Sequence, residues 1–525
     1  MTRIRVTRPA LAIICALAAP TGQAQSIGAP ESAIEWLERA LSEPPPPAVA
    51  PSPPSFAQDE TLAPKLPDAH FEPISVTPLS GAALDTTGLF TAAQIGLPRN
   101  LWGPTPAAEI IAAIEALPND TLPSAARLSL RLFTAEFAPP VTDSRTPSGA
   151  LLHARIDRLI AMGALEQAAQ LIAAAPGTDA ALHLRAFDIA LLMGEEDRAC
   201  ETMQGQITAA EGQGTQIFCM ARRGNWRAAY SGLAVAQQLN LISEAEAHLL
   251  TRFLEEEEAE FPLPPPQTIT PLALRILEAL GEPLSTSGLP VAYAHADLRG
   301  ISGWRAQLEA AERLTRAMAL QPNRLFGLYT ERRAAASGGL WERVRAVQSL
   351  ERARATGDTE LISDALIRAY PLFQATELES AFAEIHAEPL ADLQLNREAS
   401  RILWEILLLA QDRLDRAVAL APDNSLGQLV TALVTGAPLP ETNSPAMASA
   451  IVLGFAEDAL PATVQEHLDT GALGMVLLHA LEQIALAAAG DPNAATQGLR
   501  QLRAVGLDAA ARQIAVEILL LERRG

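Results

Sequence analysis

The sequence LLHARIDRLIAMGALEQAAQLIAAAP, residues 151–176, belongs to a stretch from His153 to Asn240 in which one short pattern occurs three times. In each copy a Gly is followed five residues later by an Ala, and apolar residues at helical spacing lie on both sides. Successive copies are 31 and 30 residues apart, and their paired residues are Gly163 with Ala168, Gly194 with Ala199, and Gly224 with Ala229. A period of this length is typical of stacked helix pairs. The repeat therefore predicts an all-α fold, a helical-repeat solenoid.

Each Gly separates two apolar runs, which indicates two antiparallel helices joined by a sharp turn. A Gly suits such a turn because it has no Cβ to oppose a left-handed backbone conformation. The Ala falls on the first turns of the second helix. A side chain this small lets the two helix axes approach each other closely.

The second half of the pattern resembles the tetratricopeptide repeat, which has a Gly, a large residue two positions later, an Ala and a closing Pro. The second copy departs from that pattern, because Glu196 stands where the large residue belongs and no Pro closes it. The resemblance implies antiparallel helix pairs and the binding of peptides or proteins. A plain helical domain with Gly turns is the alternative. The residues that carry the resemblance are Gly163, Leu165, Ala168 and Pro176 in the first copy, Gly224, Trp226 and Ala229 in the third, and weaker sets at Gly339 with Trp341, Gly490 with Ala495, and Gly506 with Ala511.

Residues 1–24 have the composition of a secretory signal peptide. A basic start and an apolar centre precede the small-residue sequence Gly22-Gln23-Ala24, which is typical of a cleavage site. The apolar centre is too short to span a bilayer. The segment predicts an exported protein of the bacterial periplasm, with secretion beyond that compartment as the other possibility.

The composition favours helices and argues against two classes of partner. Hydrophobic residues make up 49% of the 525 residues and aromatic residues only 4%, a balance rich in Ala and Leu that favours helix packing. The formal net charge is -22, so nucleic acid and anionic membrane surfaces are repelled at long range. We therefore expect neither as a partner.

Residues 25–97 are predicted to hold one short amphipathic helix followed by a Pro-rich, largely disordered linker. The apolar side chains of the helix are Ile34, Leu37 and Leu41, with Trp36 near their edge. A helix on such a tether either docks in a partner's groove, or packs on its own domain or stays disordered.

A change of composition predicts two helical blocks after the linker. The first block covers residues 98–261, a Pro-rich boundary covers 262–270, and the second block covers 271–525. Four glutamates, Glu255–Glu258, precede the boundary. They are either a solvated helix end or a cation site, and the first interpretation is favoured.

The chain after the signal peptide keeps two cysteines, Cys200 and Cys219. The phase of the repeat places them on neighbouring antiparallel helices. In an oxidising compartment they form a disulfide, or else they stay as two separately buried thiols. Closing a loop of about eighteen residues would stabilise the fold by roughly 3 kcal/mol.

The sequence has no recognisable catalytic or cofactor motif. Lys65 is the only lysine, which argues against a phosphate-loop lysine, a Schiff base or a Ser-Lys dyad in either block. The histidines and cysteines do not have metal-ligand spacing, so no metal or cofactor is expected.

One polar neighbourhood is dense in charged and aromatic residues. It is either a partner-binding patch, where Arg pairs with carboxylates and aromatic rings anchor the contact, or a network of ion pairs between helices. Its residues are His295, Asp297, Arg299, Arg305, Tyr329, Glu331, Arg332, Arg333 and Trp341.

These observations lead to one functional hypothesis and two alternatives. The signal sequence and the repeats predict a non-catalytic periplasmic scaffold that binds another envelope protein or peptide, although this rests on a likeness of fold. The first alternative is a cell-wall enzyme, because lytic transglycosylases also carry helical superstructures. Those enzymes carry a Gly-Leu-Met-Gln type stretch near a catalytic Glu-Ser, and this chain has no such stretch, since GMVLLHALEQ, residues 474–483, is only a superficial echo of it. The second alternative is an obligate structural subunit of an envelope complex.

Overall fold

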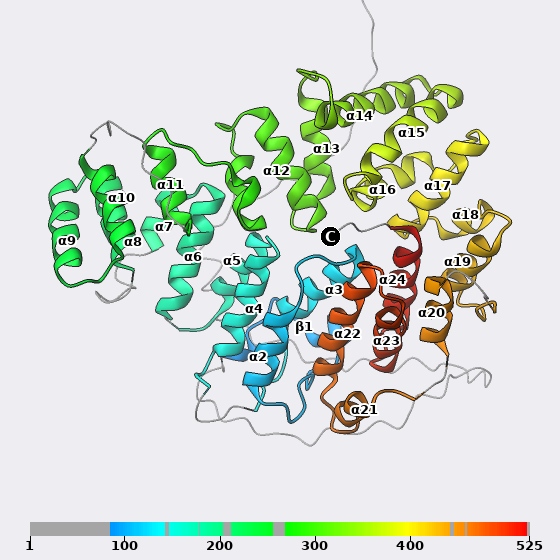
Figure 1. Ribbon diagram of the computed structural model, residues 1–525, viewed down its shortest axis with the longest axis horizontal. Coiled ribbons are helices and arrows are strands. Elements are labelled where there is room, and N and C mark those ends of the chain that lie inside the picture. The colour runs from blue at the N-terminus through cyan, green and yellow to red at the C-terminus, as the bar shows by residue number, and fades with distance from the viewer. Residues whose placement is uncertain are drawn as a thin grey trace, which may run out of the picture. The chain divides into compact units, whose positions relative to one another are not determined.

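The computed structural model describes residues 84–141, 146–177, 179–202, 212–255, 268–441, 446–456 and 459–521. The chain divides into two units, Met1–Thr77 and Pro78–Gly525, and the described residues all belong to the second. They form an almost entirely helical structure (Figure 1). Among them, no helix is long and apolar enough to cross a membrane. The predicted signal peptide and the predicted docking helix with Ile34, Trp36, Leu37 and Leu41 lie outside the described residues.

The first part of the described chain contains four α-helices, two 3-10 helices and a pair of very short strands. Strands β1 and β2 pair in parallel, with Phe90 opposite Ala135. The elements are η1 (Leu84–Thr86), β1 (Phe90–Thr91), η2 (Ala92–Ile95), α2 (Ala107–Ala116), α3 (Pro123–Thr134), β2 (Ala135–Glu136), α4 (Ala150–Ala161) and α5 (Leu165–Ala174).

The folded part starts earlier than the composition predicts. The Pro-rich character indicates a linker up to residue 97, whereas the structure has η1, β1 and η2 between residues 84 and 95. The Asp85 carboxylate explains this difference, because it accepts hydrogen bonds from the backbone N–H groups of Gly149 (3.1 Å) and Leu152 (3.0 Å) at the start of α4. A helix N-terminus leaves such N–H groups without partners and carries a partial positive charge that favours an anion.

The next six helices form a lobe with its own hydrophobic core. Phe187, Phe218 and Ile276 belong to this core, and the first two rings meet edge to face with their centroids 6.4 Å apart. In Figure 1 the lobe occupies the left side, with α9 at its outer end. Its helices are α6 (Ala180–Met193), α7 (Glu196–Thr202), α8 (Gln213–Arg222), α9 (Trp226–Gln238), α10 (Glu244–Glu255) and α11 (Pro271–Ala279).

The three Gly–Ala pairs have the backbone and burial that a helix turn needs. The glycines lie between α4 and α5, between α6 and α7, and between α8 and α9. All three have a left-handed backbone, which Gly adopts without a steric cost. The alanines are buried where the second helix of each pair meets the first. The φ values are +79° for Gly163, +80° for Gly194 and +77° for Gly224, and the exposed fractions are 0% for Ala168, 1% for Ala199 and 0% for Ala229.

After the lobe, the chain returns to the first helices. The Nε2 atom of His295 lies 2.8 Å from the carbonyl oxygen of Gly163, and α12 packs beside the same turn. The remaining elements are η3 (Thr286–Gly288), η4 (Val291–Leu298), α12 (Trp304–Arg316), α13 (Pro322–Glu331), α14 (Gly339–Thr356), α15 (Thr359–Gln374), α16 (Glu379–Leu390), α17 (Arg397–Ala410), α18 (Leu414–Ala419), α19 (Ser425–Thr435), α20 (Ala446–Phe455), α21 (Ala462–Asp469), α22 (Leu473–Ala488), α23 (Pro492–Ala504) and α24 (Asp508–Leu520).

The two ends of the described chain pack against each other, as the blue and red helices of Figure 1 show. The N–H of Gly474 in α22 donates to the carbonyl of Leu101 at 2.8 Å, and Gly474 faces the ring of Trp102 so closely that no Cβ would fit. The buried Glu517 of α24 accepts from Ser124 of α3, at 3.0 Å from its backbone N–H and 2.6 Å from its hydroxyl. Helices from both sides of the predicted boundary at 262–270 therefore share one core, although residues 262–267 themselves are not described.

We expect Glu517→Ala to weaken this contact between the two ends. The substitution leaves the N–H and hydroxyl of Ser124 without their acceptor, at a cost of roughly 2 kcal/mol, and Glu517→Gln, which keeps an acceptor oxygen, should cost less. Thermal unfolding followed by circular dichroism measures the difference. Equal midpoints for the wild type and Glu517→Ala would contradict the expected role of this hydrogen-bonded pair.

A disulfide connects α7 and α8 of the lobe. It joins Cys200 to Cys219, whose Cα atoms lie 5.3 Å apart. Thiol labelling of the mature chain, residues 25–525, is expected to find no free thiol when the chain is unfolded without reductant. After reduction, the same labelling should find two thiols per chain. Reduction should lower the stability of the lobe by roughly 3 kcal/mol through the regained freedom of the unfolded loop. Two thiols per chain without reductant would exclude the bond.

Candidate functional site

The structure separates the predicted polar neighbourhood into residues that point into the fold and residues on the surface. His295 is buried, and burial lowers the pKa of its imidazole, while the carbonyl of Gly163 opposes that change. Asp297 is half-buried and accepts from the hydroxyl of Thr286 at 2.5 Å. Both side chains therefore connect parts of the fold.

Arg299 also holds helices together. Its guanidinium pairs with Glu278 of α11 and lies 3.7 Å from Glu196 of α7. Its side chain crosses the turn at Gly194 so closely that a Cβ there would lie 2.5 Å from the Arg299 Cδ. Gly194 is thus required for two reasons, its left-handed backbone and the space that Arg299 occupies. A neighbour, Arg275, donates to the carbonyls at the end of α6.

Two aromatic residues of the neighbourhood belong to the core. The hydroxyl of the fully buried Tyr329 donates to Glu312 at 2.6 Å, and Arg343 pairs with both oxygens of that carboxylate at 2.8 and 2.6 Å. Burial, together with Glu312, raises the pKa of Tyr329 well above its ordinary value, so the hydroxyl stays protonated and donates. Trp341 is half-buried and packs on Trp304, with the ring centroids 5.1 Å apart.

The other four residues are on the surface. Arg305 pairs with Glu309 of its own helix at 2.8 Å, and Arg332 pairs with its neighbour Glu331 at 3.0 Å. Arg333 is also exposed. The structure does not bring the nine residues together on one surface, so this neighbourhood is not the best candidate for a binding site.

A cleft between α15 and α17 is a stronger candidate. It has a volume of about 720 Å³, within the range of roughly 300–1,000 Å³ that ligand sites occupy. We call it the α15–α17 cleft. Its lining residues are Ile367, Tyr370, Pro371 and Gln374 of α15, Arg397, Glu398, Ser400, Arg401, Ile402 and Glu405 of α17, and Leu420, Pro422 and Asp423 near the start of α19.

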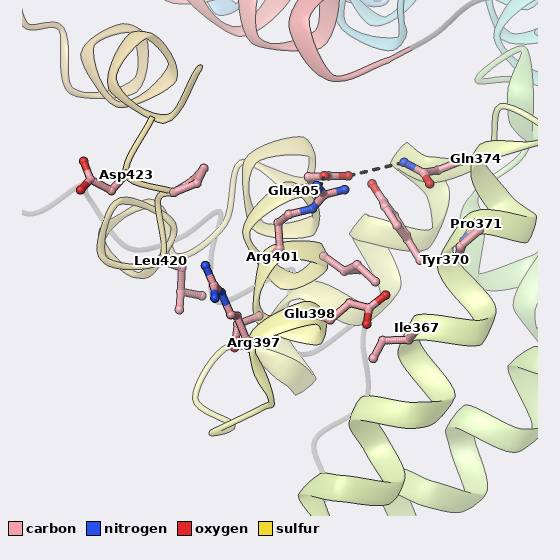
Figure 2. A pocket seen from close by; sticks show the side chains of 13 residues that line it. Ile367, Tyr370, Pro371, Gln374, Arg397, Glu398, Arg401, Glu405, Leu420 and Asp423 are labelled. Atoms are coloured by element: carbon pink, nitrogen blue, oxygen red, sulfur yellow. Dashed lines mark hydrogen bonds and ion pairs between the residues drawn. The ribbon is translucent and has the colours of Figure 1, made fainter. Parts of the chain in front are cut away.

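Three polar side chains meet at one end of the cleft (Figure 2). The Gln374 amide donates to the Glu405 carboxylate at 3.5 Å, and the Tyr370 hydroxyl points toward the same carboxylate. Burial raises the pKa of Glu405, against a lowering influence of Arg401, whose Nε lies 3.9 Å from the carboxylate. Burial, with the negative charge of Glu405, raises the pKa of Tyr370 well above its ordinary value.

The rim of the cleft carries charges of both signs. Arg397, Glu398 and Asp423 are exposed, and Arg397 has no ion-pair partner among the described residues. Aliphatic side chains such as Ile402 and Leu420 also line the cleft. This combination suits a ligand with apolar groups and with charges or hydrogen-bonding groups of both kinds, as a polypeptide segment has.

No known protein family, curated protein or solved structure matches this chain. Within the described residues, no cluster of three His, Cys, Asp or Glu side chains could hold a metal ion.

The α15–α17 cleft was not predictable from the sequence, although the sequence holds one signal of it. Glu405 interrupts the apolar run ILWEILLLA, residues 402–410, and a lone acid in a buried helix needs a polar partner. Its partners Tyr370 and Gln374 belong to a different helix, some thirty residues earlier in the chain.

Proposed function

We propose that this chain is an exported, non-catalytic helical-repeat scaffold, and that it binds a segment of another envelope protein in the α15–α17 cleft. The observation that carries the proposal is the lining of the cleft, which combines apolar side chains with exposed charges and in which Arg397 has no ion-pair partner within the described residues. The signal sequence and the resemblance to tetratricopeptide repeats support the same function and a periplasmic location.

Affinity capture from a detergent-treated envelope extract, followed by mass spectrometry, tests this function. The mature chain, residues 25–525, is compared with a version that begins at Pro78, which keeps the folded segment that starts at Leu84. The double variant Arg397→Glu, Arg401→Glu reverses the positive charge of the cleft. Arg368→Glu is the matched control, because Arg368 is an exposed arginine of α15 that does not line the cleft.

We expect one protein to be retained by the wild type, by the version from Pro78 and by Arg368→Glu, and to be lost from the double variant. Retention by every variant would place the binding surface elsewhere. If the retained protein is lost only from the version that begins at Pro78, the binding surface lies on the predicted helix at Ile34. No retained protein at all would contradict the scaffold function.

The half-buried Glu405 favours one alternative, a cell-wall enzyme. A carboxyl with a raised pKa in a cleft can act as a general acid. Muropeptide release by the purified mature chain separates the two functions. Steady turnover that is abolished in Glu405→Gln would establish the enzyme, whereas the scaffold proposal predicts no turnover by either protein.

A further inference from the structure

A second cleft lies between α5 and the turn that joins α12 to α13. Its volume is about 370 Å³, toward the lower end of the range of roughly 300–1,000 Å³ that ligand sites occupy, so it suits a small ligand. We call it the α5–α13 cleft, and it shares no lining residue with the α15–α17 cleft. Its lining residues are Glu166 and Gln167 of α5, Met318, Ala319, Leu320 and Gln321 of the turn, and Asn323 and Arg324 of α13.

The α5–α13 cleft carries one charge of each sign. Glu166 and Arg324 are both exposed, and neither has an ion-pair partner among the residues that the structure describes. Burial lowers the pKa of His295, the carbonyl of Gly163 opposes that change, and the charges of Glu166 and Arg324 also act on it, in opposite directions. Both charged groups therefore lie near one buried ring without pairing with each other. They leave room between them for a ligand that carries both charges.

Three amide side chains add hydrogen-bonding capacity to the cleft. They belong to Gln167, Gln321 and Asn323, and none of them makes a side-chain hydrogen bond within the described part of the chain. A side-chain amide both donates and accepts, as a peptide group does. The lining can therefore bind the polar atoms of a ligand that has amide or carboxylate groups.

Met318 occupies a position where the backbone favours glycine. Its φ is +59°, and α12 ends there with the N–H of Ala319 donating to the carbonyl of Leu314 at 2.9 Å. The equivalent position after α4 is Gly163. A side chain in this conformation is strained, and such strain is concentrated at ligand sites. Met318 thus places a flexible thioether on the wall of the cleft beside Leu320, where it can cover an apolar group.

We infer that the α5–α13 cleft binds a small zwitterion, either a free amino acid or a short peptide with both termini free. Its ammonium group pairs with Glu166 and its carboxylate with Arg324, while Met318 covers an apolar side chain. A purely anionic ligand is a poorer occupant, because Glu166 and the net charge of -22 repel it. A purely cationic one is repelled by Arg324. This site goes beyond the proposed scaffold function and does not depend on it.

Isothermal titration calorimetry of the mature chain with leucine and with leucyl-leucine tests this inference. We expect a Kd of about 1 mM or tighter for at least one of them. Tighter binding of leucyl-leucine would identify a short-peptide site, and equal or tighter binding of leucine an amino-acid site. N-acetylation removes the ammonium charge and C-terminal amidation removes the carboxylate, and each change should weaken binding by roughly tenfold or more.

Two substitutions assign the charges to their partners. Glu166→Gln should weaken the free zwitterion by roughly tenfold and should not weaken its N-acetylated form further. Arg324→Gln should do the same for the free zwitterion and its amidated form. Glu109→Gln in α2 and Arg368→Gln in α15 are the matched controls, because both residues are exposed and neither lines the cleft.

The double variant Arg397→Glu, Arg401→Glu should also bind the zwitterion as the wild type does, so this test is separate from that of the α15–α17 cleft. Three results would overturn the inference. These are the absence of binding by both leucine and leucyl-leucine, equal affinity for the free and the blocked forms, and an unchanged affinity in Glu166→Gln or in Arg324→Gln.

Discussion

Replacement of Arg155 by Met is expected to release the segment around η1 and β1 from the rest of the fold. Arg155 is 1% exposed, and its guanidinium donates to the carbonyls of Phe133 (3.0 Å), Ala135 (2.7 Å) and Thr87 (2.9 Å). Burial lowers its pKa to about 10, so it stays protonated at neutral pH. Met keeps the aliphatic stem and removes every donor. Because buried carbonyls without partners are costly, the expected loss is about 4 kcal/mol.

Hydrogen exchange at Leu89 measures the release locally. The N–H of Leu89 donates to the carbonyl of Thr134 at 2.7 Å, a bond that exists only while the segment is docked. Its exchange in Arg155→Met should accelerate by roughly a hundredfold or more. Arg131→Met, at an exposed arginine of α3, is the matched control and should leave the rate unchanged. Unchanged exchange in Arg155→Met would show that the guanidinium does not hold the segment.

His386 should make the fold sensitive to acid. Its side chain is fully buried between Phe382 and Phe326, at centroid distances of 4.3 and 5.2 Å, and neither ring nitrogen has a hydrogen-bond partner among the residues that the structure describes. Burial, helped by the positive charge of Arg354, lowers its pKa to about 3 from an ordinary 6.5. In the unfolded chain His386 therefore binds a proton below pH 6.5, whereas in the folded chain it stays neutral down to about pH 3. Above pH 6.5 the ionisation of His386 does not lower the free energy of unfolding. Below pH 6.5 that free energy decreases, by on the order of 4–5 kcal/mol once the pH is below both pKa values.

Thermal unfolding of His386→Phe across this range tests the prediction. At about pH 7.5 the variant should unfold near the wild-type temperature, and at about pH 4 it should unfold at a clearly higher temperature than the wild type. His248→Phe, at an exposed histidine, is the control. Asp188 acts in the opposite direction, since burial raises its pKa to about 7 and the folded chain gains stability as that carboxyl is protonated. The comparison is therefore between variants at one pH, and parallel pH profiles of His386→Phe and the wild type would contradict the prediction.

The local features of the fold follow from the sequence. The Gly–Ala pairs mark turns and close contacts within about five residues, and Gly163, Gly194 and Gly224 have the left-handed backbone that such turns need. The same reasoning places Cys200 and Cys219 on neighbouring helices, where the structure has their disulfide. Both features depend on residues that are close in the chain.

Contacts between distant parts of the chain were not predictable in this way. The bond from Ser124 to Glu517 spans 393 positions, and nothing in either local sequence indicates the other. The two interpretations of the polar neighbourhood could not be separated from the sequence for a related reason, because a density of charged residues does not tell which of them point inward. Arg299 and Tyr329 point to Glu278 and Glu312, whereas Arg305 and Arg332 stay on the surface.

The most direct test of the proposed function is photo-crosslinking in intact envelopes from two single positions. A photoreactive residue replaces Glu398, which lies at the rim of the α15–α17 cleft, or Arg368, which lies on α15 outside it. The proposal predicts a crosslink to one protein from position 398, none from position 368, and loss of that crosslink when Arg397 and Arg401 are changed to Glu. Equal crosslinking from both positions, or none from position 398, would contradict the assignment of the cleft as a binding site.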